Sequence, residues 1–142
     1  MRRPPPAPLI ADSGPVVLLA EDDDELRLLL ARKLRRAGYA VIEAATGVEL
    51  IELIVEHAMT PLTLGKRSAS LVISDVRMPG WSGLEVLSVL RRAEVTLPII
   101  LMTAFGDAAT HASARSLGAS AIYDKPVDLD VLVAAARTLI AA

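Results

Sequence analysis

Four polar sites in the sequence each stand at the end of a short, mostly apolar run, and they supply carboxylate, hydroxyl and ammonium groups. They are the acidic run 21–24, Asp75, Thr103 and Lys125. Converging carboxylates repel one another, by roughly 3 kcal/mol for two charges about 5 Å apart at an effective dielectric constant of about 20. A hard dication relieves this repulsion, and proteins hold Mg²⁺ with one or two carboxylates together with water and phosphate oxygens.

The same groups suit a carboxylate that accepts a phosphoryl group. The dication and Lys125 would neutralise the phosphoryl oxygens, Thr103 would donate its hydroxyl to one of them, and Asp75 would attack in line. Each residue alone also has an ordinary interpretation, as a helix N-terminus, a turn residue, a cap or a surface charge. What favours a shared site is that all these positions follow successive strands of one predicted sheet.

The elements that must position these residues alternate regularly along the chain. We expect strands at 16–20, 39–42, 71–74, 98–102 and 121–124, and helices at about 25–37, 46–58, 82–93, 107–117 and 128–140. This alternation predicts an α/β fold, a doubly wound five-stranded parallel sheet with five helices covering its two faces. Right-handed crossovers favour the flavodoxin-like strand order 2-1-3-4-5. Ligands of such sheets bind at the carboxyl ends of the strands, where the polar residues stand.

Composition limits the classes of function. The 142 residues fit one domain, and 53% of them are hydrophobic, so a core can form without disulfides. The chain has no cysteine, which excludes thiolate metal sites and fits a reducing cytoplasm. Its formal net charge of −2 gives no general attraction to nucleic acid or anionic membranes. We therefore expect a cytoplasmic domain with no direct nucleic-acid or membrane partner.

Two segments stand apart from the alternating pattern. Residues 1–13 contain four prolines and are expected to form a Pro-rich disordered tail, so that the folded domain is 14–142. Residues 59–69 form a polar connection that is longer than usual. This connection is either a partner-specific element or a tolerated surface insertion.

Four motifs in this order make the chain similar to a known family. They are Leu-Leu-Ala-Glu-Asp-Asp at 18–23, Ser-Asp-Val-Arg-Met-Pro-Gly at 74–80, Leu-Met-Thr-Ala at 101–104 and Asp-Lys-Pro at 124–126. Over residues 15–141 the chain resembles the receiver domain of two-component response regulators, the CheY-like superfamily. The resemblance implies that Asp75 takes a phosphoryl group from a histidine kinase or a histidine phosphotransfer protein, as part of a phosphorelay or signal-transduction system.

The resemblance also implies a ligand set. Asp22 and Asp75 would bind Mg²⁺ (or Mn²⁺) directly, Glu21 would bind it through water, and the backbone carbonyl of Arg77 would be a further ligand. Lys125 would pair with Asp75 and then with its phosphoryl group. Such a domain is not an enzyme with a separate substrate, although it assists its own phosphorylation and dephosphorylation.

The implied switch involves Thr103 and Ile122. Phosphorylation would draw the Thr103 hydroxyl inward and reposition the face of the fourth helix, fifth strand and fifth helix, to which an unknown downstream protein binds. Ile122 stands where the family has a switch aromatic, and Tyr123 should point to the opposite face of the sheet. The bond between Lys125 and Pro126 is expected to be cis.

Other functions remain open on the sequence alone. A pseudo-receiver would bind partners without phosphorylation. A hydrolase with an aspartyl-phosphate intermediate would want a second aspartate two residues after Asp75, where this chain has Arg77. Arg77 and Phe105 are candidates for shielding the phosphoryl group from water. His57 and His111 lie on predicted helices with no ligand-like companions, and we expect them to be surface residues.

Overall fold

The computed structural model describes residues 14–59 and 67–141, and the predicted tail 1–13 lies outside them, as does most of the connection 59–69. Its strands are β1 (Val16–Ala20), β2 (Ala40–Ala44), β3 (Ala69–Asp75), β4 (Ile99–Thr103) and β5 (Ala121–Asp124). Its helices are α1 (Asp24–Arg36), α2 (Gly47–Ile54), the π-helical turn η2 (Val55–Met59), α3 (Gly83–Arg92), α4 (Ala108–Ser116) and α5 (Leu129–Ala141).

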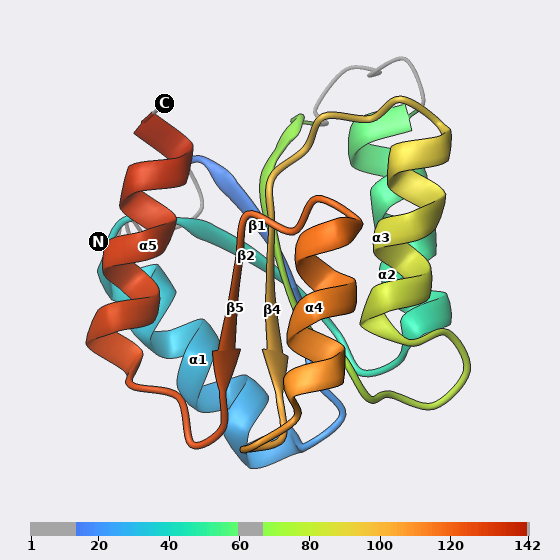
Figure 1. Cartoon of the computed structure of the whole chain (residues 1–142). Coiled ribbons are helices and arrows are strands. Elements are labelled where there is room, and N and C mark those ends of the chain that lie inside the picture. The colour runs from blue at the N-terminus through green and yellow to red at the C-terminus, as the bar shows by residue number, and fades with distance from the viewer. Residues whose placement is uncertain (1–13, 60–66, 142) are drawn as a thin grey trace, which may run out of the picture.

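The described strands form one parallel sheet in the order β2-β1-β3-β4-β5, which confirms the predicted topology (Figure 1). Side chains of β1 alternate between two cores. Val17 and Leu19 pack with residues of α1 and α5, whereas Leu18 and Ala20 pack with residues of α2, α3 and α4. Because both faces are covered, β1 is buried throughout, which explains its continuous apolar sequence.

Caps fix the helices that begin beside the strand ends. The Asp23 side chain accepts hydrogen bonds from the backbone N–H groups of Glu25 and Leu26, so it is the N-cap of α1. Ser82 and Glu85 form a capping box at the start of α3. The second helix extends as far as predicted, but its last turn is the π-helical η2. These caps fix where each strand end turns into the following helix.

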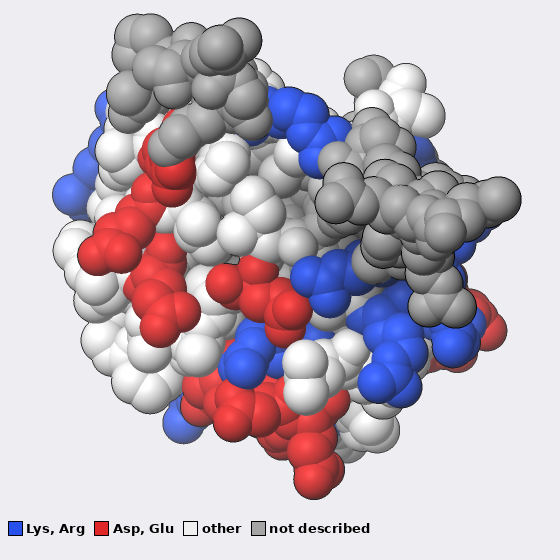
Figure 2. All heavy atoms as spheres, turned by 180° about the vertical axis from the view of Figure 1, so that it is seen from behind, with Lys and Arg blue, Asp and Glu red and all other residues white. Residues whose placement is uncertain are grey.

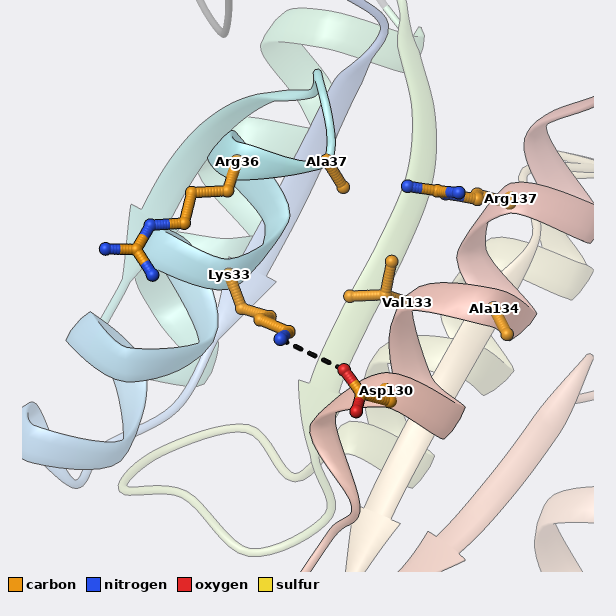
Figure 3. A pocket seen from close by; sticks show the side chains of 7 residues that line it. All are labelled: Lys33, Arg36, Ala37, Asp130, Val133, Ala134 and Arg137. Carbon is orange, nitrogen blue, oxygen red and sulfur yellow. Dashed lines mark ion pairs between the residues drawn. The ribbon is translucent and has the colours of Figure 1, made fainter.

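Helices α1 and α5 lie side by side on one face of the sheet (Figure 1). A groove between them is lined by the C-terminal end of α1 and by α5 residues between Asp130 and Arg137, and Lys33 Nζ bridges it to Asp130 Oδ1 at 3.0 Å (Figure 3). Because α1 begins immediately after β1, most of this groove lies away from the carboxyl ends of the strands. No described helix has the length and apolar character needed to cross a membrane.

Candidate functional site

The predicted polar residues converge at the carboxyl edge of the sheet. Lys125 Nζ lies 2.6 Å from Glu21 Oε1 and 2.8 Å from Asp75 Oδ2, so one ammonium group bridges the ends of β1 and β3. Glu21 is fully buried and Asp75 is 6% exposed. Burial of two carboxylates requires a positive charge between them, and Lys125 provides it.

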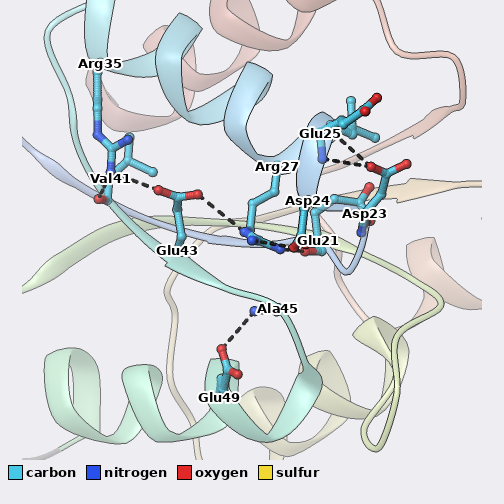
Figure 4. Close-up of polar contacts among 11 residues, drawn as sticks. Glu21, Asp23, Asp24, Glu25, Arg27, Arg35, Val41, Glu43, Ala45 and Glu49 are labelled. Atoms are coloured by element: carbon cyan, nitrogen blue, oxygen red, sulfur yellow. Dashed lines mark hydrogen bonds and ion pairs between the residues drawn. The ribbon is translucent and has the colours of Figure 1, made fainter.

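The turn after β1 is held by an arginine. The backbone N–H of Glu21 donates to the Ala44 carbonyl at 3.0 Å, while Arg27 Nη1 donates to the Glu21 carbonyl at 2.9 Å (Figure 4). The same guanidinium pairs with Asp24 at 2.7 Å and with Glu43 at 3.4 Å. Arg27 therefore ties α1 and β2 to the turn that carries the acidic pair, and sequence reasoning did not identify this role.

Asp75 is held by the chain that follows it. Its Oδ1 accepts a hydrogen bond from the Arg77 backbone N–H at 3.3 Å. The N–H of Gly83 donates to the Val76 carbonyl at 2.8 Å. A Cβ atom at Gly83 would lie 2.6 Å from the Asp75 carbonyl oxygen, so only glycine lets α3 begin this close to Asp75.

Thr103 lies at the end of β4, one residue beyond Met102, which is the register partner of Asp75. The Thr103 side chain is buried, and its hydroxyl oxygen has no hydrogen-bond partner within the described residues. Its carbonyl accepts from the Lys125 backbone N–H at 2.7 Å. A buried hydroxyl without a partner is uncommon, and it leaves Thr103 able to donate to a group that arrives beside Asp75.

Three carboxylates of the site can share a cation. Ligand oxygens of Glu21, Asp22 and Asp75 lie within 4.8 Å of one another, and Asp22 is exposed to solvent. Figure 2 shows acidic side chains gathered at the lower edge of the molecule, where the strands end. An all-oxygen donor set with an open side fits Mg²⁺, which keeps several waters when bound.

Burial and charge set the protonation of the site. Burial raises the pKa of Glu21 to about 7, although the hydrogen bond from Lys125 acts in the opposite direction. Burial lowers the pKa of Lys125, but its hydrogen bonds to Asp75 and Glu21 outweigh burial and raise that pKa above its usual value. The ammonium group therefore stays charged at neutral pH.

The raised pKa of Glu21 predicts a stabilising substitution. When an acid has a higher pKa in the folded than in the unfolded protein, its ionisation lowers the stability of the fold. For Glu21 this loss develops as pH rises from about 4.5 through about 7. Without metal, Glu21→Gln should therefore increase the free energy of unfolding at pH 8 by on the order of 1 kcal/mol, and much less at pH 5. Urea denaturation at both pH values measures this. An equal change at both would contradict the assignment.

Comparison with known proteins agrees with this geometry. Residues 17–137 match the model of the response regulator receiver domain family. The chain belongs to this family. The acidic cluster of Glu21, Asp22 and Asp75 fits a receiver-domain Mg²⁺ site.

Individual relatives support the same family. The chain is 33% identical to the DNA-binding transcriptional regulator NtrC of Escherichia coli over 119 residues, covering 84% of this chain but only 23% of NtrC. It is 27% identical to sporulation initiation phosphotransferase F of Bacillus subtilis, covering 80% of this chain and 84% of that protein. A putative response regulator from Chloroflexus aurantiacus superposes with a TM-score of 0.76 at 30% identity, covering 91% of this chain and 99% of that one.

The structure also places the remaining residues of the predicted site and switch. Ile122 packs in the core under α2, α3 and α4, and Tyr123 packs on the opposite face of the sheet, as strand alternation predicted. The peptide bond between Lys125 and Pro126 is cis, as expected. Trp81 is 39% exposed, and its backbone lies against Gly47 at the start of α2. The role of the Arg77 carbonyl stays a prediction.

Both histidines differ from the sequence prediction. His111 is half-buried, and its Nε2 lies 2.6 Å from Asp124 Oδ1 at the end of β5. It therefore has a specific partner, contrary to the expectation of an ordinary surface residue. His57 is also half-buried, with its Nδ1 2.9 Å from the Arg67 carbonyl. Neither contact has a local sequence signal, because the partners are 10 and 13 residues apart in the sequence.

Proposed function

We propose that this receiver accepts a phosphoryl group on Asp75 from a histidine kinase or a histidine phosphotransfer protein, and that phosphorylation changes its binding of a downstream partner. The observation that carries the proposal is the Lys125 ammonium group, which bridges Glu21 and Asp75 at 2.6 and 2.8 Å. The ammonium group lies beside Oδ2 of Asp75, and a carboxylate oxygen is the nucleophile that phosphoryl transfer needs.

The transfer exchanges one bond to phosphorus for another. A carboxylate oxygen of Asp75 forms the new bond as the bond to the imidazole nitrogen of phosphohistidine breaks. The imidazole leaves with that electron pair, and it is neutral when its other ring nitrogen carries a proton. In dephosphorylation water attacks phosphorus, the Asp75 carboxylate leaves, and the proton of water passes to phosphate or solvent.

Positive charge and a hydroxyl stabilise the transferred group. Lys125 moves from pairing with Asp75 to pairing with its phosphoryl oxygens, and Thr103 donates to another of those oxygens. Asp22 and Asp75 would hold Mg²⁺ (or Mn²⁺), with Glu21 acting through water and the Arg77 carbonyl as a further ligand. When bound, the cation supplies positive charge that offsets the negative charge of the phosphoryl oxygens.

Two alternatives differ from this proposal in what they do with phosphate. A pseudo-receiver would not be modified, and a hydrolase would turn over small phosphate esters. The exposed Arg77 stands where a hydrolase would place its acid, which favours a receiver over a hydrolase. Incubation with phosphoramidate and Mg²⁺, followed by intact mass measurement, distinguishes the receiver from the pseudo-receiver. Addition of one phosphoryl group supports the proposal, and no Mg²⁺-dependent addition supports the pseudo-receiver.

The side chain of Arg77 is expected to slow loss of the phosphoryl group. Arg77 is exposed at the rim of the site. Hydrogen bonds from Thr110 lower the pKa of Asp107, and the positive charge of Arg77 makes a smaller contribution in the same direction. Arg77→Ala should speed autodephosphorylation roughly two- to fivefold, the range for losing one exposed charged contact. Single-turnover decay of the phosphoprotein measures the rate. Arg92→Ala, an exposed arginine on α3, is the control, and equal rates for all three proteins would refute shielding.

A further inference from the structure

Helix α4 is held to the sheet by little apolar contact. It buries one residue, Ala114, whereas each of α1, α2, α3 and α5 buries three or four. Its first turn is fixed by Asp107, whose side chain accepts from the Thr110 backbone N–H at 3.1 Å. A helix with so small a buried face depends on its polar contacts for its position.

The polar contact that joins α4 to β5 is the pair His111–Asp124. Nε2 of His111 lies 2.6 Å from Oδ1 of Asp124, and the two side chains are 21% and 34% exposed. Within the described residues, it is the one side-chain hydrogen bond between these two elements. A short bond to a carboxylate with limited solvent contact is stronger than an ordinary surface pair.

Asp124 also lies next to residues of the candidate site in the sheet and in the sequence. It stands opposite Thr103 in the β4–β5 register and directly precedes Lys125. The Lys125 backbone N–H donates to the Thr103 carbonyl at 2.7 Å, and its Nζ donates to Asp75. The contact between α4 and β5 is therefore one residue from the lysine that will meet the phosphoryl group.

Strand alternation places this contact on the side of the sheet that α4 covers. Ile122 and Asp124 point to the same face of β5, and Ile122 packs in the core that contains Ala114. The Ile122 side chain has no hydrogen-bonding atom. Asp124 is therefore the residue of β5 that can make a polar contact on this face.

A change in the position of Thr103 can displace α4. Its buried hydroxyl has no described partner, and a phosphoryl oxygen on Asp75 would provide one. The chain from Thr103 to α4 is short, and its residues 104–106 are all exposed. A rotation or shift of Thr103 is therefore passed through few residues to Asp107 and the first turns of α4, where His111 lies.

We propose that His111 and Asp124 are positioning residues of the phosphorylation switch. Their hydrogen bond holds α4 against β5 in the unphosphorylated protein, and it is lost when Thr103 turns toward the phosphoryl group. Asp107 and Arg115 line the same hollow and are the other charged groups beside the pair. The proposal rests on phosphorylation of Asp75, and it names the contact that phosphorylation must break to release α4.

Beryllofluoride with Mg²⁺ tests the proposal, because it mimics a phosphoryl group on a carboxylate. His111→Ala and Asp124→Asn should each tighten beryllofluoride binding about two- to tenfold, the range for one partly exposed charged hydrogen bond that stabilises only the resting state. The double variant should bind no tighter than the singles. His111→Gln, which keeps an N–H donor, should lie closer to wild type. Amide signals in an NMR titration give the bound fraction and report folding.

The controls separate this inference from the proposed function. Ser113→Ala changes an exposed residue of α4 away from the pair and should bind beryllofluoride as wild type does. If wild type binds beryllofluoride but the folded variants bind it equally or more weakly, the positioning role is overturned and the phosphorylation proposal stands. If wild type binds none in Mg²⁺, both are overturned. Additive effects in the double variant would likewise show that the two residues do not act through their shared bond.

Discussion

Asp75→Asn is expected to abolish phosphorylation of this receiver. The amide has nearly the shape of the carboxylate, so the fold and the close approach of Gly83 to the Asp75 carbonyl should survive. The amide nitrogen and oxygen are poor nucleophiles, and Lys125 loses one of its two anionic partners. With phosphoramidate and Mg²⁺, intact mass measurement should detect one added phosphoryl group on wild type and none on the variant, a loss greater than about 100-fold in rate.

A matched aspartate separates nucleophilic attack from a general effect of charge. Asp130→Asn also removes one carboxylate, but it is exposed on α5 and pairs with Lys33. This control should be phosphorylated at the rate of wild type. Persistent modification of Asp75→Asn would place the acceptor elsewhere in the acidic cluster, and peptide mapping would then be directed at Asp22 and Glu21.

The fold could be predicted because its strongest signals are local. Strands buried on both faces have continuous apolar sequences, and the runs at 16–20 and 98–102 correspond to β1 and β4 within a residue or two. The capping box at Ser82 and Glu85 set the start of α3. Since parallel strands end at one edge of the sheet, the residues after them had to converge, and so Glu21, Asp75 and Lys125 could be placed together before their distances were known.

Other parts of the site depend on contacts that have no local pattern. Arg27 reaches the Glu21 carbonyl because α1 packs at a particular rotation over β1 and β2, and this rotation is set by the whole core. His111 meets Asp124 because α4 lies over the end of β5, although 13 residues separate them in sequence. The π-helical end of the second helix likewise gave no periodic signal that distinguishes it from an α-helix. Long-range side-chain contacts of this kind can be identified only in the three-dimensional structure.

Lys125→Met is expected to cause the largest loss of stability of any substitution in the site. Methionine keeps much of the apolar stem of lysine but leaves Glu21 and Asp75 without the ammonium group between them. Removing one partner of a buried ion pair costs about 3–5 kcal/mol, and because Lys125 is 28% exposed we expect about 2 kcal/mol at pH 8 without metal. Urea denaturation measures the loss of free energy of unfolding.

The dependence of this stability loss on pH and on Mg²⁺ tests whether it arises from the missing positive charge. The pKa of Glu21 is about 7 with Lys125 present and should be higher without it, because the hydrogen bond from Lys125 lowers this pKa. The loss of stability should therefore shrink as pH falls from 8 toward 7, where Glu21 becomes protonated in both proteins. Millimolar Mg²⁺ should restore part of the stability at pH 8, because a dication between the same carboxylates replaces the missing charge. Lys33→Met, which breaks the exposed pair with Asp130, should cost less than about 1 kcal/mol and should not respond to Mg²⁺. Equal losses in the two variants, with no effect of Mg²⁺ on either, would mean that Lys125 does not neutralise the site.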